Sequence, residues 1–192
     1  MTEQGNLPTQ RVNISTQKML GGIGYILITL SWIPRIGILL SIVGFVLWLI
    51  SMYQLSNILR KPSIFQKVLI AFILSIVGMV IAFAFGLMTG VSLFASVRGE
   101  AGAILGLGLG VAFAILVAYA TLVVSFYFYK EAYDILAQAT NQNLFKIAGL
   151  LLFIGAITVI LFGLGALLII VGEIVLAVAF FTAPNEVEVQ GT

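Results

Sequence analysis

Glu173 is the residue in this chain whose type and position could most readily do chemistry. It lies in the apolar segment ALLIIVGEIVLAVAFF, and no other charged residue occurs between Ile147 and Asn185. A charge near the centre of a bilayer costs about 3 kcal/mol on insertion scales, so such a carboxyl needs a function or a hydrogen-bonding partner. Glu173 is therefore either a proton or cation site, or a protonated structural carboxyl bound to a hydroxyl of a neighbouring helix. The candidate hydroxyls are those of Ser41, Ser75, Thr121, Ser125 and Thr158.

The remaining residues offer little other chemistry. The chain has no Cys and no His, which excludes thiol chemistry, disulfides and the usual zinc, haem and iron–sulfur ligation. The glycine-rich run at 106–110 is not expected to bind phosphate, because no strand precedes it. Membrane enzymes need clustered polar catalytic groups, so we expect no enzyme, no catalytic residue, no metal site and no cofactor. A net charge of +2 gives no reason to expect a nucleic-acid partner.

The composition is that of a membrane protein. Hydrophobic residues make up 61% of the chain and charged residues 8%, whereas about a quarter of residues are charged in soluble domains. Apolar stretches predict an all-α, six-span transmembrane bundle at 18–183, between polar tails at 1–17 and 184–192. The predicted spans cover residues 19–33, 36–55, 68–97, 101–129, 147–162 and 165–183.

The basic residues predict the orientation. Seven of the nine Lys and Arg residues fall on the face that holds both termini, and only Arg35 and Arg98 fall on the other. The positive-inside rule then places both termini in the cytoplasm, in a multi-pass protein of the cell (inner) membrane. An aromatic belt at the inner membrane surface is expected from Trp48, Tyr53, Tyr127, Phe128 and Tyr129.

Small residues spaced four apart indicate where two helices meet, because helices in lipid associate through close backbone contact. Spans three and four each carry such a ladder, which predicts a tightly packed antiparallel pair in the centre of the bundle. Folding the chain at Ser96–Gly99 would bring Gly86 level with Gly106, and Gly78 level with Ala114. Both spans are longer than a hydrocarbon core of about 30 Å, so they are expected to tilt, protrude or break, and a break would fall at 85–90. The ladder residues are Gly78, Ala82, Gly86, Gly90, Gly102, Gly106, Gly110 and Ala114.

The two ends of the membrane domain resemble each other. When residues 18–53 are aligned with 146–181, GILLSIVG at 37–44 pairs with GALLIIVG at 165–172, with six of eight positions identical. The alignment predicts two hairpins of the same orientation, a parallel repeat of the kind found in some transporters. The counterpart of Glu173 is Phe45, so the carboxyl belongs to one half only.

Several short motifs carry a family resemblance. LGGIG at 20–24, Pro34 and Gly37, IVGF at 42–45, Leu55, and SIF at 63–65 resemble an uncharacterised family of small prokaryotic polytopic membrane proteins with a domain of unknown function. The resemblance implies a prokaryotic membrane protein and implies no activity, ligand or catalytic residue.

Two functions are compatible with these observations. The first is a small non-enzymatic permeation or transport module with Glu173 as its proton or cation site. The alternative is a membrane-embedded structural or assembly subunit, in which Glu173 is a protonated structural carboxyl. The expected partners are the lipid bilayer and either further copies of the chain or another membrane subunit.

Overall fold

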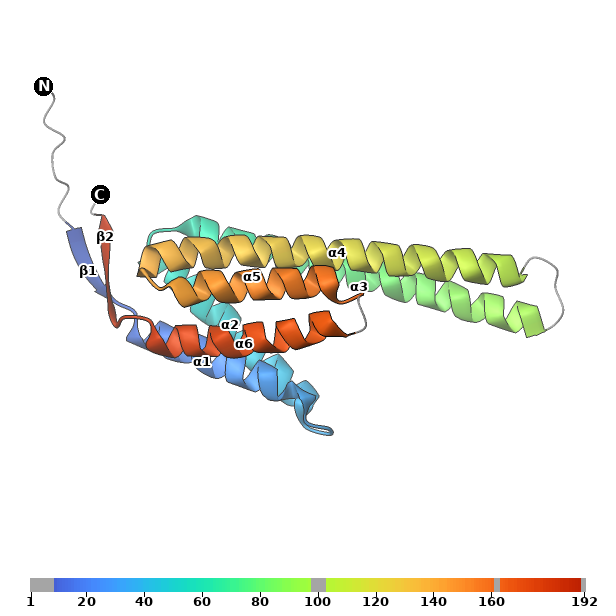
Figure 1. The fold of residues 1–192 in the computed structure, drawn as a ribbon, viewed down its shortest axis with the longest axis horizontal. Coiled ribbons are helices and arrows are strands. Elements are labelled where there is room, and N and C mark those ends of the chain that lie inside the picture. The colour runs from blue at the N-terminus through green and yellow to red at the C-terminus, as the bar shows by residue number, and fades with distance from the viewer. Residues whose placement is uncertain (1–8, 98–102, 161–162, 191–192) are drawn as a thin grey trace, which may run out of the picture. The chain divides into compact units, whose positions relative to one another are not determined.

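The computed structural model describes residues 9–97, 103–160 and 163–190. Six helices follow one another in the chain (Figure 1): α1 (Ser15–Thr29), α2 (Gly37–Ile58), α3 (Pro62–Val97), α4 (Ala103–Thr140), α5 (Asn143–Thr158) and α6 (Leu164–Thr182). A short 3-10 turn, η1 (Leu30–Trp32), follows α1, and two strands, β1 (Thr9–Asn13) and β2 (Glu186–Gln190), flank the helices. The predicted all-α architecture with six helices is confirmed.

The helices differ in the length of membrane that they can cross. Apolar stretches in α2, α3, α4 and α6 are long enough to span a bilayer. Helices α1 and α5 have 15 and 16 residues. At a rise of 1.5 Å per residue they are about 23 Å long, shorter than a hydrocarbon core of about 30 Å.

The chain forms two compact units. The first contains Met1–Val68 and Tyr129–Thr192, and the second contains Leu69–Phe128. Helices α1, α2, α5 and α6 belong to the first unit, together with the start of α3 and the end of α4. The second unit is the remainder of the α3–α4 hairpin.

The two polar tails pair with each other in the first unit. Strands β1 and β2 are antiparallel, with Val12 opposite Val187, and the chain continues this pairing with a 2.8 Å hydrogen bond from the Ile14 N–H to the Asn185 carbonyl oxygen. Alternating valine in EVEVQ suits an extended strand. The pairing places both termini at the same end of the first unit, as an even number of spans requires. Which side of the membrane this end faces remains a prediction.

The predicted repeat is visible in how the two hairpins of the first unit pack. Helices α1 and α5 begin at Ser15 and Asn143, which are equivalent in the alignment that pairs Lys18 with Lys146. At the far end of the hairpins, Gly37 packs against the backbone of Ser31, and its counterpart Gly165 packs against the backbone of Val159. Ser31 and Val159 are themselves equivalent, so both contacts recur at the same positions.

A second contact recurs in the middle of the hairpins. A side chain placed on Gly44 would meet the Gly24 carbonyl oxygen at 2.6 Å, and one placed on Gly172 would meet the Leu152 side chain at 2.9 Å. Gly44 and Gly172 are equivalent, as are Gly24 and Leu152. The two hairpins therefore share one packing register.

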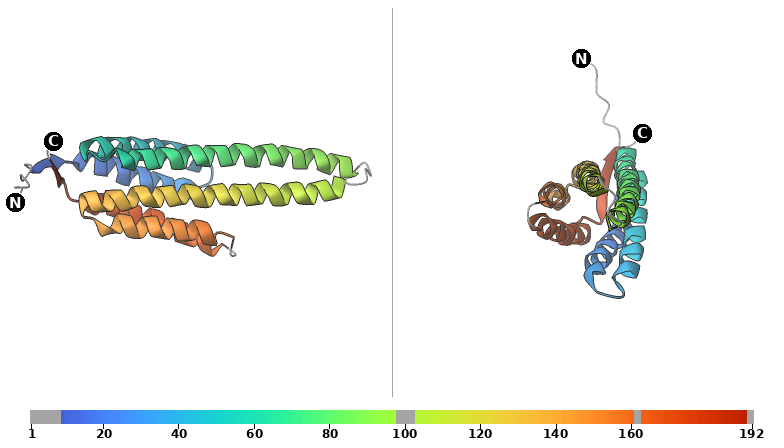
Figure 2. Two further views of the ribbon diagram at one scale, coloured as in Figure 1. Left: turned by 90° about the horizontal axis from the view of Figure 1, so that it is seen from above. Right: turned by 90° about the vertical axis from the view of Figure 1, so that its right-hand side faces the viewer.

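Helices α3 and α4 run antiparallel beside each other (Figure 2) and pack tightly, as predicted. The predicted register is wrong, however, because Gly78 packs against Thr121 and not against Ala114, which lies two turns earlier in α4. The rings of Phe85 and Phe113 contact each other with centroids 5.0 Å apart. The register differs because α3 continues to Val97 and α4 begins at Ala103, so that the chain reverses later than expected.

Of the expected alternatives of tilt, protrusion or break, α3 does not break, since it is continuous from Pro62 to Val97. Breaking a helix in lipid would leave backbone groups without hydrogen bonds, which favours a continuous helix. A side-chain carbon placed on Gly86 or on Gly90 would meet no described heavy atom of another element within 4 Å. Gly102 lies outside the described residues, and the surroundings of Gly106 are likewise not described.

Candidate functional site

Glu173 lies at the midpoint of α6, nine residues from Leu164 and nine from Thr182. Helix α6 packs against α1 and α5 within the first unit. The Glu173 side chain is half-buried, and its Oε2 atom is buried without a hydrogen-bond partner among the described residues. The carboxyl is thus enclosed at the middle of a helix that is long and apolar enough to cross a bilayer.

The hydroxyl that accompanies Glu173 is that of Thr29, the last residue of α1. Thr29 is a hydrogen-bonding neighbour of the Glu173 carboxyl. Its own hydroxyl proton is donated to the Tyr25 carbonyl oxygen at 2.9 Å. Because a hydroxyl has a single proton, Thr29 can donate to only one of these two oxygens at a time, and it accepts when it does not donate to the carboxyl.

Thr29 was not among the hydroxyls predicted from the sequence. Four of those donate instead to the carbonyl four residues earlier in their own helix: Ser75, Thr121, Ser125 and Thr158. Such bonding is common for hydroxyls inside helices and leaves them without a free proton. The signal that could have identified Thr29 is its spacing of four residues from Tyr25, which places both side chains on one face of α1.

Aromatic side chains enclose the polar groups next to Glu173. The hydroxyls of Tyr25 in α1 and Tyr133 in α4 form a hydrogen bond, and both rings are buried. The Tyr25 ring stacks on Phe180 of α6, with centroids 6.0 Å apart. Trp48 of α2 contacts the edge of Tyr25 at 5.9 Å. Residues from four helices of the first unit therefore meet at this point.

Trp48 is buried in this cluster, with 3% of its surface exposed, and its place in an aromatic belt stays a prediction. The Trp48 indole N–H lies near Tyr133 but forms no hydrogen bond with a described residue. Trp48 also contacts the ring of Tyr129 at 5.6 Å. The cluster of Tyr25, Thr29, Trp48, Tyr129, Tyr133 and Glu173 is called the Glu173 cluster below.

The Glu173 cluster contains one carboxyl and otherwise neutral hydroxyl and indole groups. Within the described ranges, no three His, Cys, Asp or Glu side chains come together to hold a metal ion. Sites for divalent metals are usually built from several carboxylates. The arrangement therefore suits a proton or a singly charged cation better than a divalent metal.

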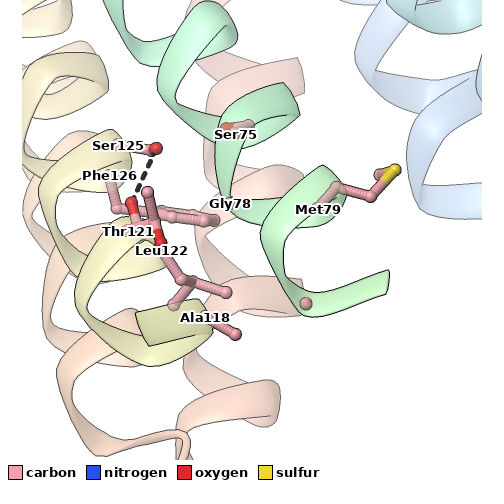
Figure 3. Close-up of a pocket in the computed structure, with 9 residues that line it drawn as sticks. Ser75, Gly78, Met79, Ala118, Thr121, Leu122, Ser125 and Phe126 are labelled. Atoms are coloured by element: carbon pink, nitrogen blue, oxygen red, sulfur yellow. Dashed lines mark hydrogen bonds between the residues drawn. The ribbon is translucent and has the colours of Figure 1, made fainter. Parts of the chain in front are cut away.

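The second unit contains a groove of about 190 Å³ between α3 and α4 (Figure 3). Small and hydroxyl-bearing side chains form most of its wall. The hydroxyls of Ser75 and Ser125 donate to carbonyls of their own helices, so the groove presents oxygen acceptors and apolar groups. The lining residues are Ser75, Gly78, Met79, Ala82, Ala118, Thr121, Leu122, Ser125 and Phe126.

The comparisons with known proteins agree with this description. The chain belongs to the family described as protein of unknown function (DUF996), whose model matches residues 40–174. An uncharacterised protein of Methanocaldococcus jannaschii is 30% identical over 179 residues, which cover 93% of this chain and 97% of that protein. No solved structure matches the chain. The predicted membership of an uncharacterised family is confirmed, and the matched region includes Glu173.

Proposed function

We propose that this protein is a small non-enzymatic membrane module that takes up and releases a proton at Glu173 during permeation. The observation that supports this proposal most directly is the enclosed Glu173 carboxyl, whose Oε2 atom has no hydrogen-bond partner among the described residues. A purely structural carboxyl is expected to have its oxygens satisfied, because an unpaired buried polar group costs about 1 to 3 kcal/mol. An unpartnered oxygen at the middle of a spanning helix is typical of a functional group.

The neighbouring Thr29 is compatible with both protonation states of Glu173. When the Thr29 proton bonds the Tyr25 carbonyl, a protonated Glu173 can donate its own proton to the Thr29 oxygen. When the Thr29 hydroxyl turns toward Glu173, it can donate to the ionised carboxylate instead. A neighbour that can pair with both forms of the carboxyl suits a group that takes up and releases a proton.

The test is proton flux into proteoliposomes that contain a pH-sensitive dye and both sodium and potassium chloride. Glu173→Gln keeps the size and the donor capacity of the group but cannot titrate, so it should abolish flux while leaving thermal stability unchanged. Glu188→Gln makes the same chemical change at an exposed carboxyl of β2 and should transport like the wild type. Equal flux through wild type and Glu173→Gln would contradict the proposal.

A second candidate function, a structural or assembly subunit, is favoured by the groove in the second unit. Grooves lined by Gly, Ala, Ser and Thr are typical of sites where another transmembrane helix packs. We propose a second copy of the chain as its occupant under this alternative. The chain has no native Cys, so Met79→Cys in the groove should cross-link two copies in membranes, whereas Ile38→Cys on an exposed face of α2 should not.

A further inference from the structure

The turn between α1 and α2 carries a surface pocket of about 270 Å³. It lies at the end of the α1–α2 hairpin that is opposite to β1 and β2 (Figure 1). Ser31 of η1 supplies one wall and the start of α2 supplies the other, and the two walls touch because Gly37 packs against the Ser31 backbone. The lining residues are Ser31, Gly37, Ile38, Ser41 and Ile42.

The two polar side chains of this pocket are available to a ligand. Within the described part of the chain, the hydroxyls of Ser31 and Ser41 form no hydrogen bond. Other helical hydroxyls of the first unit, such as those of Thr29 and Thr158, donate to the carbonyl four residues earlier. A hydroxyl without a partner is unfavourable in apolar surroundings, so the pocket offers two hydrogen-bond donors that a ligand would satisfy.

Arg35 supplies a positive charge beside the pocket. It is exposed in the turn two residues before Gly37, and it forms no ion pair with a described residue. It is also the only charged residue between Lys18 and Arg60, so the α1–α2 hairpin contains no carboxylate. A lone arginine between two apolar helices marks the level of the lipid headgroups, where its guanidinium stays hydrated. This end of the hairpin therefore attracts anions.

The second hairpin shows that the backbone of the turn does not require an arginine. Arg35 and its counterpart Gly163 adopt the same left-handed conformation, with φ of 74° and 81°. Glycine adopts this conformation without strain, whereas a residue with a Cβ does so at a cost in stability. The two serines are also specific to the first hairpin, because Val159 and Ile169 stand at the equivalent positions. Three polar groups thus occur together at one turn only, and one of them costs stability, which favours a role in binding.

We propose that this pocket binds an anionic phospholipid, whose phosphate lies between Arg35 and the hydroxyls of Ser31 and Ser41. A guanidinium pairs with two phosphate oxygens at once, and hydroxyls donate to the remaining oxygens. The exposed side chains of Ile38 and Ile42 form the apolar part of the wall and contact the start of an acyl chain. This apolar wall favours a lipid over a free phosphate ion. The lipid site does not depend on the proposed function.

The single positive charge decides which headgroup is preferred. The phosphate of an anionic headgroup such as phosphatidylglycerol has no cation of its own, so Arg35 neutralises it. The phosphate of phosphatidylcholine is already balanced by the choline group of the same molecule. Because the hairpin contains no carboxylate, no side chain within it competes with the lipid for the guanidinium. An anionic lipid should therefore bind more tightly than a zwitterionic one with the same acyl chains.

The test is thermal unfolding of the full chain in a neutral maltoside detergent with increasing dioleoyl-phosphatidylglycerol. A ligand that binds the folded protein raises the midpoint temperature. Dioleoyl-phosphatidylcholine has the same acyl chains with a zwitterionic headgroup, and sodium phosphate supplies the anion without acyl chains. Phosphatidylglycerol should raise the midpoint temperature to a plateau, and the other two should raise it much less at the same concentration.

Three variants locate the response. Arg35→Gly should weaken the apparent affinity for phosphatidylglycerol about tenfold, and it should not lower the midpoint temperature in detergent alone, because glycine suits the left-handed turn. Ser41→Ala removes one donor and should weaken the affinity about fivefold. The matched control is Arg60→Gly, which makes the same change at another arginine with positive φ, at the opposite end of α2, and should leave the affinity unchanged.

The outcomes separate a lipid site from general attraction of charges. Loss of the phosphatidylglycerol response in Arg35→Gly but not in Arg60→Gly would support the site. An unchanged response in Arg35→Gly, or an equal loss in Arg60→Gly, would overturn it. Equal stabilisation by phosphatidylcholine would contradict an anionic headgroup, and equal stabilisation by sodium phosphate would show that the pocket binds a free anion and not a lipid.

Discussion

The two hairpins of the first unit, α1–α2 and α5–α6, share their packing register and differ in chemistry. Gly44 meets the backbone of α1, at the Gly24 carbonyl oxygen, whereas its counterpart Gly172 meets the Leu152 side chain. The next position is Phe45 in the first hairpin and Glu173 in the second. Phe45 packs on Trp48 with centroids 5.5 Å apart, and Glu173 lies beside the end of α1.

This difference shows how a repeated hairpin can acquire a polar site. Backbone contact in α1–α2 brings the two helices so close that only glycine fits at Gly44. Leu152 fills the corresponding space in α5–α6, so at this level the second hairpin makes contact through a side chain that can shift, and its backbone contact lies nearer the turn, at Gly155 and Gly165. The carboxyl lies in the half with the more adaptable contact, and its neighbour Thr29 comes from the other half.

The comparison is tested most severely by adding one methyl group to each equivalent glycine. Gly44→Ala should lower the free energy of unfolding by about 3 kcal/mol, because the new carbon would collide with backbone atoms. Gly172→Ala should cost less than about 1.5 kcal/mol, because Leu152 can change its rotamer. Thermal unfolding in detergent measures both. Equal losses would mean that the two hairpins are not packed differently.

A second comparison extends this reasoning to the α3–α4 hairpin. A side-chain carbon on Gly78 would meet Thr121 at 2.8 Å, whereas Gly86, two turns further along α3, has open space. Gly78→Leu should therefore destabilise the protein by about 1 to 2 kcal/mol, and Gly86→Leu should be close to neutral. Thermal unfolding of the pair decides between the register described here and the predicted one, in which Gly86 would be the tighter contact.

The smallest expected effect concerns the lysines that are equivalent in the two hairpins. Lys18 donates to the carbonyl oxygens of Ala183 and Phe181, at 2.6 and 3.4 Å, at the C-terminal end of α6. Lys18→Met should lower stability by about 1 kcal/mol through loss of this cap. Lys146 is exposed, so Lys146→Met should change stability by less than about 0.5 kcal/mol. A larger loss in Lys146→Met would show that the second lysine has an equivalent role.

Much of the fold could be predicted because its determinants are local. Runs of apolar residues free of charge define the helices. The small residues of α3 and α4 predicted that these two helices pair, although Gly86 and Gly90 meet no described neighbour. The repeat was detectable from GILLSIVG and GALLIIVG, and the structure reproduces it in the contacts of Gly37 with Ser31 and Gly165 with Val159. The register of α3 against α4 was not predictable in this way, since it depends on where the chain reverses between Val97 and Ala103.

The sequence by itself determined that Glu173 is an isolated carboxyl in a membrane helix, because hydropathy and charge are properties of a single segment. Only the tertiary structure decided its neighbours. In lipid, a helix face that contacts another helix is as apolar as one that contacts acyl chains, so the sequence pattern does not separate them. Thr29 lies beside Glu173 because α1 packs on α6. Trp48 is buried because Tyr25 of α1 and Tyr129 of α4, both distant in the sequence, pack against it.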